Sequence, residues 1–318
     1  MYSIKNRYGG LELRLERLTD QPILVPDGRR DWEVGGVFNP GVIKNGTDYI
    51  MIYRAFGKDK ISRLGYASSK NGISWRKNPR PIIEPDPSDK QESRGMEDPR
   101  IVKLNGSYYI TYTAAEGFPV RKSWRWRTMI RILVTEDFKE IGKITPSLHG
   151  IGEKNDKDAV LFPAKVNGQY WLLHRVIPDV HIAQSTNLIS WQEKGTVIKN
   201  RQDGWSYIKV GAAAPPVLTD YGWLMFYHGV RRDKSYALGV ALLDAADPCK
   251  LTHLLPYAIF EPERDYELFG VVPRVVFGTS VLEVGSALWV YYGAADRVIG
   301  VAAIDKKILL DNLVRYMV

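Results

Sequence analysis

The sequence is poor in cysteine, with Cys249 the only one among 318 residues. A single cysteine cannot form an internal disulfide, so it gives no sign of an oxidising compartment. Apolar residues never run to the roughly 18 that a membrane helix needs. The segment from Met1 to Gly10 also lacks the apolar stretch of a signal peptide. These absences predict a cytoplasmic protein that does not associate with membranes.

The signatures of metal and nucleotide chemistry are missing as well. The five histidines form no HExxH motif, and there is no Walker A pattern and no G-x-G-x-x-G. With no paired cysteines, a structural zinc site is not indicated either. We therefore expect neither a metal nor an organic cofactor.

What the sequence does contain is a modest excess of positive charge. Lys and Arg number 44 against 36 Asp and Glu, which gives a net charge of +8 in an otherwise ordinary globular composition, 45% hydrophobic and 11% aromatic. Such an excess is typical of a nucleic-acid surface, of a solvated surface, or of a site for a small anion. Only the positions of the basic residues can distinguish these classes.

A proline-containing motif recurs five times with a period near 60 residues. The prolines stand at positions 40, 99, 163, 216 and 273, separated by 59, 64, 53 and 57 residues. After each we expect a short apolar strand and then a tight turn, at Asn45-Gly46, Asn105-Gly106, Asn167-Gly168, Tyr221-Gly222 and Val284-Gly285. Asn-Gly favours two-residue hairpin turns because both residues adopt positive φ easily. The repeat therefore predicts five β-hairpins.

Second and third strands are expected after each turn. The second strands, rich in aromatic residues, are expected at 49–53, 108–112, 170–174, 223–228 and 289–292, and the third at 63–68, 129–134, 180–184, 237–242 and 298–303. The first and third repeats share an extension, Ser69–Trp75 and Ser185–Trp191.

Five antiparallel sheets at a regular period predict an all-β fold, a five-bladed β-propeller. We expect one catalytic domain over residues 1–318, with blades at about 35–80, 95–145, 155–200, 205–262 and 268–305. A short C-terminal helix from Ile308 to Val318 is expected to cross one face.

Geometry then selects one end of the propeller as the functional face. The residue that begins the first strand of a hairpin lies beside the residue that ends the second, so five radial hairpins bring these positions together. They are Asn39, Asp98, Lys157, Asp158 and Lys209 at the beginnings, and Arg54, Thr113, Arg175, His228 and Asp296 at the ends. Each could be polar simply because loops face water. A whole ring of Arg, His, Lys and Asp is more typical of a binding site.

The ring divides by charge. Asp98, Asp158 and Asp296 are acids, whereas Lys157, Arg175, Lys209 and His228 form a basic cluster from two adjacent repeats. Fixed cations that lack matching carboxylates favour an anion, and arginine suits phosphate through its planar fork of donors. A carboxylic acid beside an anion site indicates glycosyl transfer to phosphate.

At Gly95–Arg100 the sequence resembles glycoside hydrolase family 130, the β-mannoside phosphorylases and related β-mannosidases. The match runs from about residue 35 to 305. Its motifs are Phe38–Pro40, Tyr53–Ala55, Asp156–Pro163, Leu173–Arg175, Lys209–Ala212, Tyr227–Val230 and Tyr292–Asp296. The resemblance implies a five-bladed propeller and an activity on β-mannosides.

The resemblance also implies roles for individual residues. The family's general acid falls on Asp98, and its phosphate ligands fall on Arg175, Lys209 and His228, with Lys157 as a fourth. Some members have Arg-Asn in place of Lys157-Asp158. The hydrolytic members lack the basic set that this chain keeps, which favours phosphorolysis.

The resulting hypothesis is an inverting phosphorylase. Asn39, Arg54 and Asp296, with Asp158, are expected to hold a terminal mannose while phosphate attacks the anomeric carbon from the opposite face, giving α-mannose 1-phosphate. Phosphate is already anionic, so no carboxylate base is needed. Asp98 must carry a proton, and burial or the neighbouring Glu97 is expected to raise its pKa. In the family that proton is thought to pass through the 3-hydroxyl of the sugar.

Two other functions fit the same residues. One is an inverting β-mannosidase that uses water, with Asp158, Asp296 or another acid as its base. The other is a carbohydrate-binding propeller without chemistry. Phosphate dependence separates the first from a phosphorylase, and an Asp98→Asn variant addresses the second.

The segment Arg121–Arg127 is the one feature that favours nucleic acid, because it interleaves basic and aromatic residues. We expect it in the loop between the second and third strands of the second blade. There Trp124 or Trp126 could stack on an acceptor sugar, the loop could pack on another subunit of a homo-oligomer, or it could simply be solvated. Its position above the expected site argues against a nucleic-acid partner.

The linkage and the acceptor are left open by the sequence. We predict β-1,2-mannobiose or short β-1,2-oligomannosides as substrates. β-1,4-Mannosides with glucose, mannose or N-acetylglucosamine as the acceptor are the alternatives.

Overall fold

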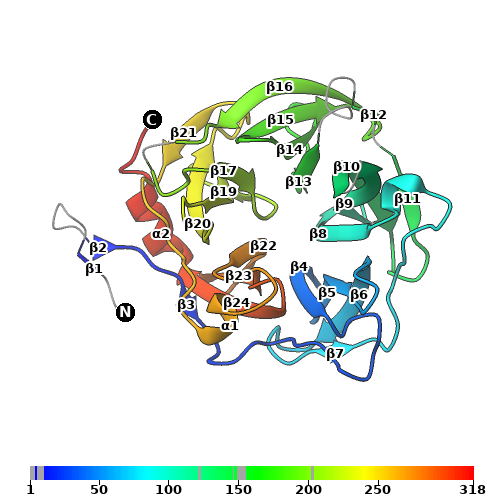
Figure 1. Ribbon diagram of the computed structural model, residues 1–318. Coiled ribbons are helices and arrows are strands. Elements are labelled where there is room, and N and C mark those ends of the chain that lie inside the picture. The colour runs from blue at the N-terminus through cyan, green and yellow to red at the C-terminus, as the bar shows by residue number, and fades with distance from the viewer. Residues whose placement is uncertain (1–3, 6–10, 121–122, 146, 149–154, 202–203) are drawn as a thin grey trace.

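The chain forms a ring of five antiparallel blades around a central axis (Figure 1), and one parallel bridge between Ser62 and Gly95 joins blades 1 and 2 into a single sheet. A computed structural model describes residues 4–5, 11–120, 123–145, 147–148, 155–201 and 204–318. The first strand of each sheet lies nearest the axis and the later strands lie progressively outward. The fold is the five-bladed β-propeller that the repeat predicts.

Each of the first three blades is a four-stranded meander. Blade 1 contains β4 (Gly36–Asn45), β5 (Asp48–Phe56), β6 (Ser62–Ser69) and β7 (Arg76–Lys77), and blade 2 contains β8 (Gly95–Leu104), β9 (Ser107–Val120), β10 (Ser123–Thr135) and β11 (Gly142–Ile144). Blade 3 contains β13 (Asp156–Leu161), β14 (Tyr170–Val176), β15 (Asp179–Ser185) and β16 (Ser190–Ile198). A two-residue strand, β12 (Ser147–Leu148), adds to the outer edge of blade 3 in parallel with β16.

Blades 4 and 5 vary this plan. In blade 4 the first strand is split into β17 (Lys209–Ala212) and β18 (Val217–Thr219), followed by β19 (Gly222–Val230), β20 (Tyr236–Leu243) and β21 (Leu251–Leu254). Blade 5 contains β22 (Val276–Val284), β23 (Ala287–Ala294) and β24 (Val298–Asp305), and its outer strand is β3 (Glu16–Arg17) from near the N-terminus. The start of the chain therefore closes the ring, which the sequence did not predict. A separate hairpin pairs β1 (Ile4–Lys5) with β2 (Leu11–Glu12).

The hydrophobic core is divided among the interfaces between neighbouring blades. Ile52 of blade 1 packs in one cluster with Ile110 of blade 2, and Leu173 of blade 3 packs with Met225 of blade 4. Because both faces of each sheet are covered, the strands are apolar on both sides, as in the uniformly buried β19. Burial of apolar surface at these interfaces stabilises the ring.

A β-bulge recurs in the first strands of blades 1, 2 and 3. The pairing register shifts after Phe38, Glu97 and Lys157, and the next residue in each case has positive φ: Asn39 (47°), Asp98 (53°) and Asp158 (56°). Asn and Asp tolerate this left-handed conformation better than most residues that carry a side chain. One backbone feature thus brings three polar side chains to equivalent places near the axis.

The proline spacing misplaced the third repeat. We expected its first strand after Pro163, but β13 ends at Leu161, and the residue equivalent to Pro40 and Pro99 by register is Ala159. The bulge, rather than the proline, is the repeated unit, because positive φ at the preceding Asp158 is what aims a side chain at the axis.

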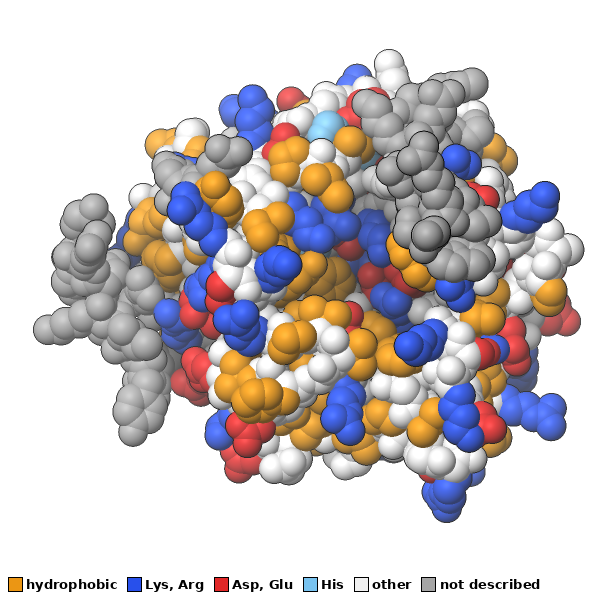
Figure 2. Space-filling view, viewed as in Figure 1, with side chains coloured by type: hydrophobic (Ala, Val, Ile, Leu, Met, Phe, Trp, Pro, Cys, Tyr) orange, Lys and Arg blue, Asp and Glu red, His pale blue; other side chains and the backbone are white. Residues whose placement is uncertain are grey.

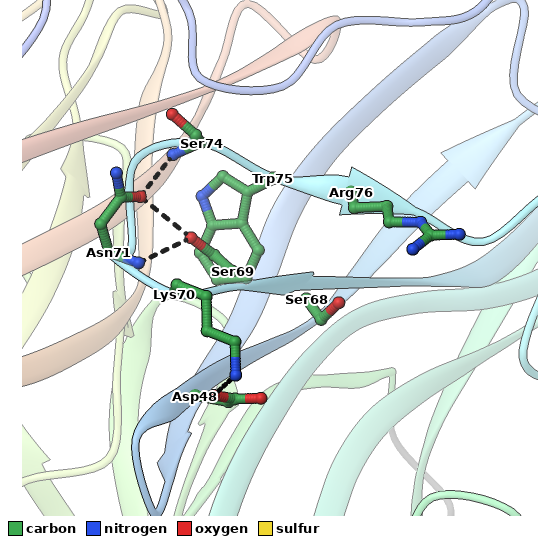
Figure 3. A pocket seen from close by; sticks show the side chains of 8 residues that line it. All are labelled: Asp48, Ser68, Ser69, Lys70, Asn71, Ser74, Trp75 and Arg76. Carbon is green, nitrogen blue, oxygen red and sulfur yellow. Dashed lines mark hydrogen bonds and ion pairs between the residues drawn. The ribbon is translucent and has the colours of Figure 1, made fainter.

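The extension shared by blades 1 and 3 caps the third strand in the same way in both. In Figure 3, Asn71 Oδ1 accepts from the Ser74 backbone N–H (2.8 Å), and Ser69 Oγ accepts from Asn71 N–H (3.2 Å). Asn187 and Ser185 make the equivalent bonds in blade 3. These side chains replace the backbone partners of a tight bend, so the motif is structural.

The C-terminal helix and the basic segment differ from expectation. Helix α2 spans Lys306–Leu313 rather than Ile308–Val318, because the Asp305 side chain caps its start by accepting from Ile308 N–H. It lies at the outer edge beside β20 and β24, not across a face (Figure 1). A second helix, α1 (Asp265–Leu268), is a single turn. Neither helix of the described residues is long and apolar enough to cross a membrane.

The part of the segment Arg121–Arg127 that the structure describes belongs to a strand, not a loop. β9 and β10 extend beyond the other hairpins and pair from Val120–Ser123 onward. Trp126 is about half exposed (51%), with the Arg94 guanidinium 4.9 Å from its ring centroid. Arg121 and Lys122 and the side chain of Trp124 lie outside the described residues.

Candidate active site

A cavity of about 150 Å³ opens at the axial end of the first strands. Its lining includes eight of the nine residues that the sequence predicted: Asn39, Arg54, Asp98, Lys157, Asp158, Arg175, Lys209 and Asp296. The ninth, His228, is fully buried just behind Asp158. Figure 2 shows basic and acidic side chains gathered in the hollow at the middle of this face.

Strand register explains why these residues meet. Arg54 pairs with Phe38 and Arg175 with Lys157, so each lies beside the bulge of its own first strand. His228 takes the equivalent place in blade 4, opposite Gly211, where the described first strand Lys209–Ala212 has no bulge. Thr113 takes the same place in blade 2, opposite Glu97, but is buried and does not line the cavity. The hairpin geometry expected from the sequence is therefore correct for Arg54, Thr113, Arg175 and His228. In blade 5 the equivalent residue by register is Gly293, whereas Asp296 reaches the cavity from the turn that follows β23.

Asp98 occupies the acidic side of the cavity. Its Oδ1 accepts a hydrogen bond from Asn39 Nδ2 (2.7 Å) and another from Arg54 Nη1 (3.1 Å). Arg54 Nη2 donates to Glu97 Oε1 (2.6 Å), and Lys157 Nζ donates to Glu97 Oε2 (2.8 Å). Glu97 thus joins the two cations that flank Asp98.

The pKa of Asp98 moves in the direction opposite to our expectation. Burial acts to raise it, but the positive charges of Arg54, Lys157 and Arg100 and the hydrogen bond from Asn39 together hold the pKa below its usual range. These neighbours therefore favour the ionised form of Asp98 at neutral pH. The expectation that burial or Glu97 would raise its pKa above the usual range is wrong.

Asp296 behaves in the reverse way. Burial raises its pKa to about 6, with Asp98 and Glu97 adding to the rise and Arg54 and Lys157 opposing it. Among the carboxyl groups that line the cavity, Asp296 is the one whose pKa lies nearest to neutrality. Asp98 and Asp296, which line the same cavity, thus have pKa values that are shifted in opposite directions.

Asp158 occupies the other side of the cavity, inside the basic cluster. Its Oδ2 lies 2.7 Å from Arg175 Nη1 and 3.5 Å from His228 Nε2. Its Oδ1 lies 3.5 Å from Nη2 of Arg100, a fully buried arginine whose Nη1 donates to the Asp98 backbone carbonyl (2.7 Å). Arg100 therefore connects the two bulges that carry Asp98 and Asp158.

The cluster is less positive than the sequence indicated. Carboxylates match two of its members, Arg175 with Asp158 and Lys157 with Glu97, so the premise of cations without matching carboxylates is wrong. Burial lowers the pKa of His228 to about 3; the charge of Asp158 opposes this shift, and those of Arg175, Lys209 and Arg100 add to it. His228 is therefore a neutral imidazole at physiological pH.

Lys209 remains a cation, but a weakened one. Burial lowers its pKa to about 8, with Arg175 contributing and Asp158 opposing. Its Nζ lies 5.5 Å from the ring centroid of Tyr236, so an aromatic face supports the ammonium. Lys209 and Arg175 are the two charges best placed to receive an anion.

Several residues that line or support the cavity were not predicted from the sequence. Tyr236 and Phe277 flank His228, with ring centroids 5.9 and 4.5 Å from that of the imidazole. Val272 and Val275 complete the apolar wall. Arg100 lies in the motif Gly95–Arg100 that carried the resemblance, so its position was visible although its role was not. Tyr236 begins a third strand, and nothing in the sequence pattern marks it.

The arrangement can bind a neutral polar ring on its acidic side and an anion beside it. Carboxylates and amides accept and donate to hydroxyl groups, whereas Arg175 and Lys209 supply charge-assisted donors. Within the described ranges, no group of three or more His, Cys, Asp or Glu converges as metal ligands.

The chain is similar to known proteins over nearly its whole length. The family model for β-1,4-mannooligosaccharide phosphorylase, glycoside hydrolase family 130, matches residues 14–315. A 1,2-β-oligomannan phosphorylase of Thermoanaerobacter sp. (strain X514) is 38% identical over 306 residues, covering 93% of this chain and 98% of its own length. A β-1,2-mannobiose phosphorylase of the same organism is 38% identical over 307 residues, covering 92% and 98%.

A solved structure shares the fold. The β-1,2-mannobiose phosphorylase of Listeria innocua, in complex with β-1,2-mannobiose, superimposes with a TM-score of 0.83 at 23% identity, covering 95% of this chain and 99% of that one. At that identity the likeness establishes the propeller architecture.

Proposed function

Because the chain belongs to glycoside hydrolase family 130, we propose that it is an inverting phosphorylase that cleaves β-mannosides with inorganic phosphate. The products are α-mannose 1-phosphate and a free acceptor sugar. The relatives that are 38% identical over nearly their full length carry phosphorylase activities in their names, which supports this reaction class over hydrolysis and over binding alone.

The observation that carries the proposal is one cavity with two sides. A buried acid, Asp98, lies on one side, and Arg175 and Lys209 lie on the other, with Asp158 and neutral His228 between them. An inverting hydrolase needs a carboxylate that activates water. A phosphorylase instead needs fixed donors for phosphate, and this cavity supplies them.

In the proposed reaction the terminal mannose binds between Asn39, Arg54 and Asp296. Phosphate, held by Arg175, Lys209 and Lys157, with His228 supporting the site from behind Asp158, attacks the anomeric carbon through one oxygen from the face opposite the leaving group. The carbon–oxygen bond to the acceptor breaks as the new bond forms, and a proton that Asp98 supplies ends on the leaving oxygen. Asp158 fixes the Arg175 guanidinium and borders the sugar.

Asp98 must gain a proton before it can act. Bound phosphate adds up to two negative charges beside it, which opposes the pull of Arg54, Lys157 and Arg100 on its pKa, because like charges disfavour ionisation. Phosphate binding thereby favours the protonated form of Asp98. This account predicts that the pKa of Asp98 rises when phosphate binds, and infrared difference spectroscopy of its carboxyl band can measure it. An Asp98 band that stays ionised at saturating phosphate and mannoside would contradict the role.

For the substrate we propose β-1,2-mannobiose or short β-1,2-oligomannosides, which the relatives' names support. The test runs the reaction backwards with α-mannose 1-phosphate and a panel of mannose, glucose, N-acetylglucosamine and mannobiose acceptors. We expect phosphate release with mannose or mannobiose and a β-1,2 linkage in the product by NMR. A β-1,4 linkage in the product would contradict the proposed substrate. Release of mannose without any phosphate requirement would contradict the proposed phosphorylase activity. No cofactor besides phosphate is proposed, and cytoplasmic location and homo-oligomer formation stay predictions.

A further inference from the structure

A buried polar network repeats behind the active site, one blade after another. Its centre is the second-strand residue that precedes Arg54, Thr113, Arg175 and His228 in blades 1 to 4, namely Tyr53, Tyr112, His174 and Tyr227. In blade 5 the residue at the equivalent register is Tyr292, which precedes Gly293. Each network also has an outer position, which strand register defines. The centre pairs with a residue of the third strand, and the residue two positions further along that strand pairs with the outer position. It is occupied by Lys77, Lys143, Glu193, Leu254 and Arg17.

In blade 1 the network is complete. Tyr53 Oη donates to Oε2 of the fully buried Glu33 (3.0 Å), and Lys77 Nζ donates to Glu33 Oε1 (2.6 Å). Blade 2 repeats it, with Tyr112 Oη donating to Glu92 Oε1 (2.5 Å) and Lys143 paired with the same carboxylate. In each of these blades a buried carboxylate thus accepts a hydrogen bond from a phenol and pairs with a cation. These two interactions offset the free-energy cost of removing the carboxylate from water.

Blade 5 uses the same three groups. Tyr292 Oη donates to Glu267 Oε1 (2.8 Å), and Arg17 on β3 donates to both oxygens of Glu267. Blade 3 has a different set of groups, because His174 replaces the tyrosine. Its Nδ1 lies 2.9 Å from Asp156 Oδ2, and its Nε2 lies 2.9 Å from Glu193 Oε2. In these four blades a carboxylate from the protein occupies the network.

Blade 4 keeps the tyrosine but changes the other two parts. Tyr227 is buried, and its ring packs on Gly239 as the rings of Tyr53 and Tyr292 pack on Gly65 and Gly300. Glu33 and Glu92 stand six residues before the bulge residue of their blades, and the equivalent place before Ala212 holds Ser206. The outer position holds Leu254.

A cavity of about 160 Å³ lies where the acid and the cation would be. It is lined by Arg201, Trp205, Ser206, Tyr227, Leu254 and Pro256, among others. Burial raises the pKa of the Tyr227 hydroxyl, so the group stays protonated and can donate. Arg201 lines the same cavity and brings a positive charge to it.

We propose that this blade-4 cavity binds a small monocarboxylate, which takes the place that a glutamate side chain fills in blades 1, 2 and 5. The phenol of Tyr227 donates to the carboxylate, Arg201 supplies the positive charge, and Leu254 and Pro256 accept a short alkyl group. A water molecule takes up about 30 Å³ of liquid, so the volume holds about five waters or one acid of two to three carbons.

The proposal is tested with acetate as the probe, by isothermal titration calorimetry at saturating phosphate so that the catalytic cavity is occupied, with sodium chloride as the ionic control. We expect one acetate per chain. Tyr227→Phe should weaken binding about tenfold or more, because a hydrogen bond to a charged group contributes about 1.5–3 kcal/mol. Tyr53→Phe, which removes the same hydroxyl from the complete network of blade 1, is the matched control and should leave acetate affinity unchanged.

A second variant tests the site by filling it. Ser206→Glu combined with Leu254→Lys rebuilds the acid and the cation of blade 1, and we expect it to abolish acetate binding. The proposal is overturned if the unmodified protein binds no acetate, if Tyr227→Phe binds it as tightly, if Tyr53→Phe loses as much, or if the folded double variant retains native affinity.

Discussion

Asp98 and Asp158 begin from the same local structure and end in different chemistry. Each is the left-handed residue of a bulge in a first strand, each is buried, and each follows a residue of the Glu97–Lys157 ion pair. Asp98 accepts from Asn39 and Arg54 on a single oxygen, whereas Asp158 has Arg175 on one oxygen and Arg100 on the other. The neighbours, not the residue type or the backbone, therefore distinguish Asp98, the proposed proton donor, from Asp158, which holds two buried arginines.

The largest effect is expected when the two acids are neutralised in turn. Asp98→Asn should lower kcat by about 10²- to 10⁴-fold, the usual contribution of a positioned acid, with the phosphate KM nearly unchanged. Asp158→Asn should instead raise the phosphate KM and lower the melting temperature, because it leaves Arg100 and Arg175 buried without their carboxylate. Steady-state kinetics and thermal denaturation measure both. The distinction fails if the two variants lose kcat equally at unchanged phosphate KM.

A smaller effect is expected on the basic side. Arg175→Ala should raise the phosphate KM by about 10- to 100-fold, since charge-assisted hydrogen bonds contribute about 1.5–3 kcal/mol each. Arg54→Ala is the matched change on the acidic side and should act on the mannoside KM instead. Initial rates with each substrate varied in turn measure this. Equal effects of both variants on both KM values would argue against two separate half-sites.

The pH dependence of phosphate binding should follow Lys209. Its pKa is lowered to about 8, so its charge is present below that pH and is lost as the pH rises through it. We expect the phosphate KM to increase several-fold between pH 7.5 and 9.5, a range in which inorganic phosphate is mainly the dianion. Lys209→Arg should remove this increase because arginine stays charged. An unchanged pH profile in that variant would assign the titration to another group.

The smallest effect is expected at Asp296. Its pKa is raised to about 6, so the folded state is favoured while the carboxyl is protonated and loses that advantage as the pH rises through 6. Asp296→Asn should therefore raise the melting temperature more at pH 8 than at pH 4. In kinetics at saturating phosphate, the mannoside KM of the unmodified enzyme should increase modestly below pH 6, and the variant should not show this. Scanning calorimetry and initial rates against pH provide the measurements.

Much of the site was visible in the sequence because hairpin geometry is local. Arg54 and Arg175 end second strands, so counting from a turn brought them to the axis without knowledge of any contact. The proline period failed at Pro163 because the repeated feature is the positive φ of Asn39, Asp98 and Asp158, which is followed by proline in blades 1 and 2 and by alanine in blade 3. The closing strand β3 was not predictable, since two residues carry no hydrophobic period.

The electrostatics could not be predicted. Burial and charge partners set the pKa values of Asp98, Asp296 and His228, and those partners come from different blades. Tyr236 and Phe277 approach His228 only through the packing of β20 against β22.

The sequence by itself determined the five-bladed propeller and the ring of residues around its axis, because turn residues and strand period act over a few positions. The tertiary structure alone decided that the excess of positive charge at the cavity is partly neutralised, by Asp158 beside Arg175 and by Glu97 beside Lys157. It also decided that blade 4 keeps Tyr227 beside a cavity where blades 1, 2 and 5 place a glutamate. Such facts depend on which side chains meet across separations that run from 17 residues, between Asp158 and Arg175, to 250 residues, between Arg17 and Glu267, and no local pattern encodes them.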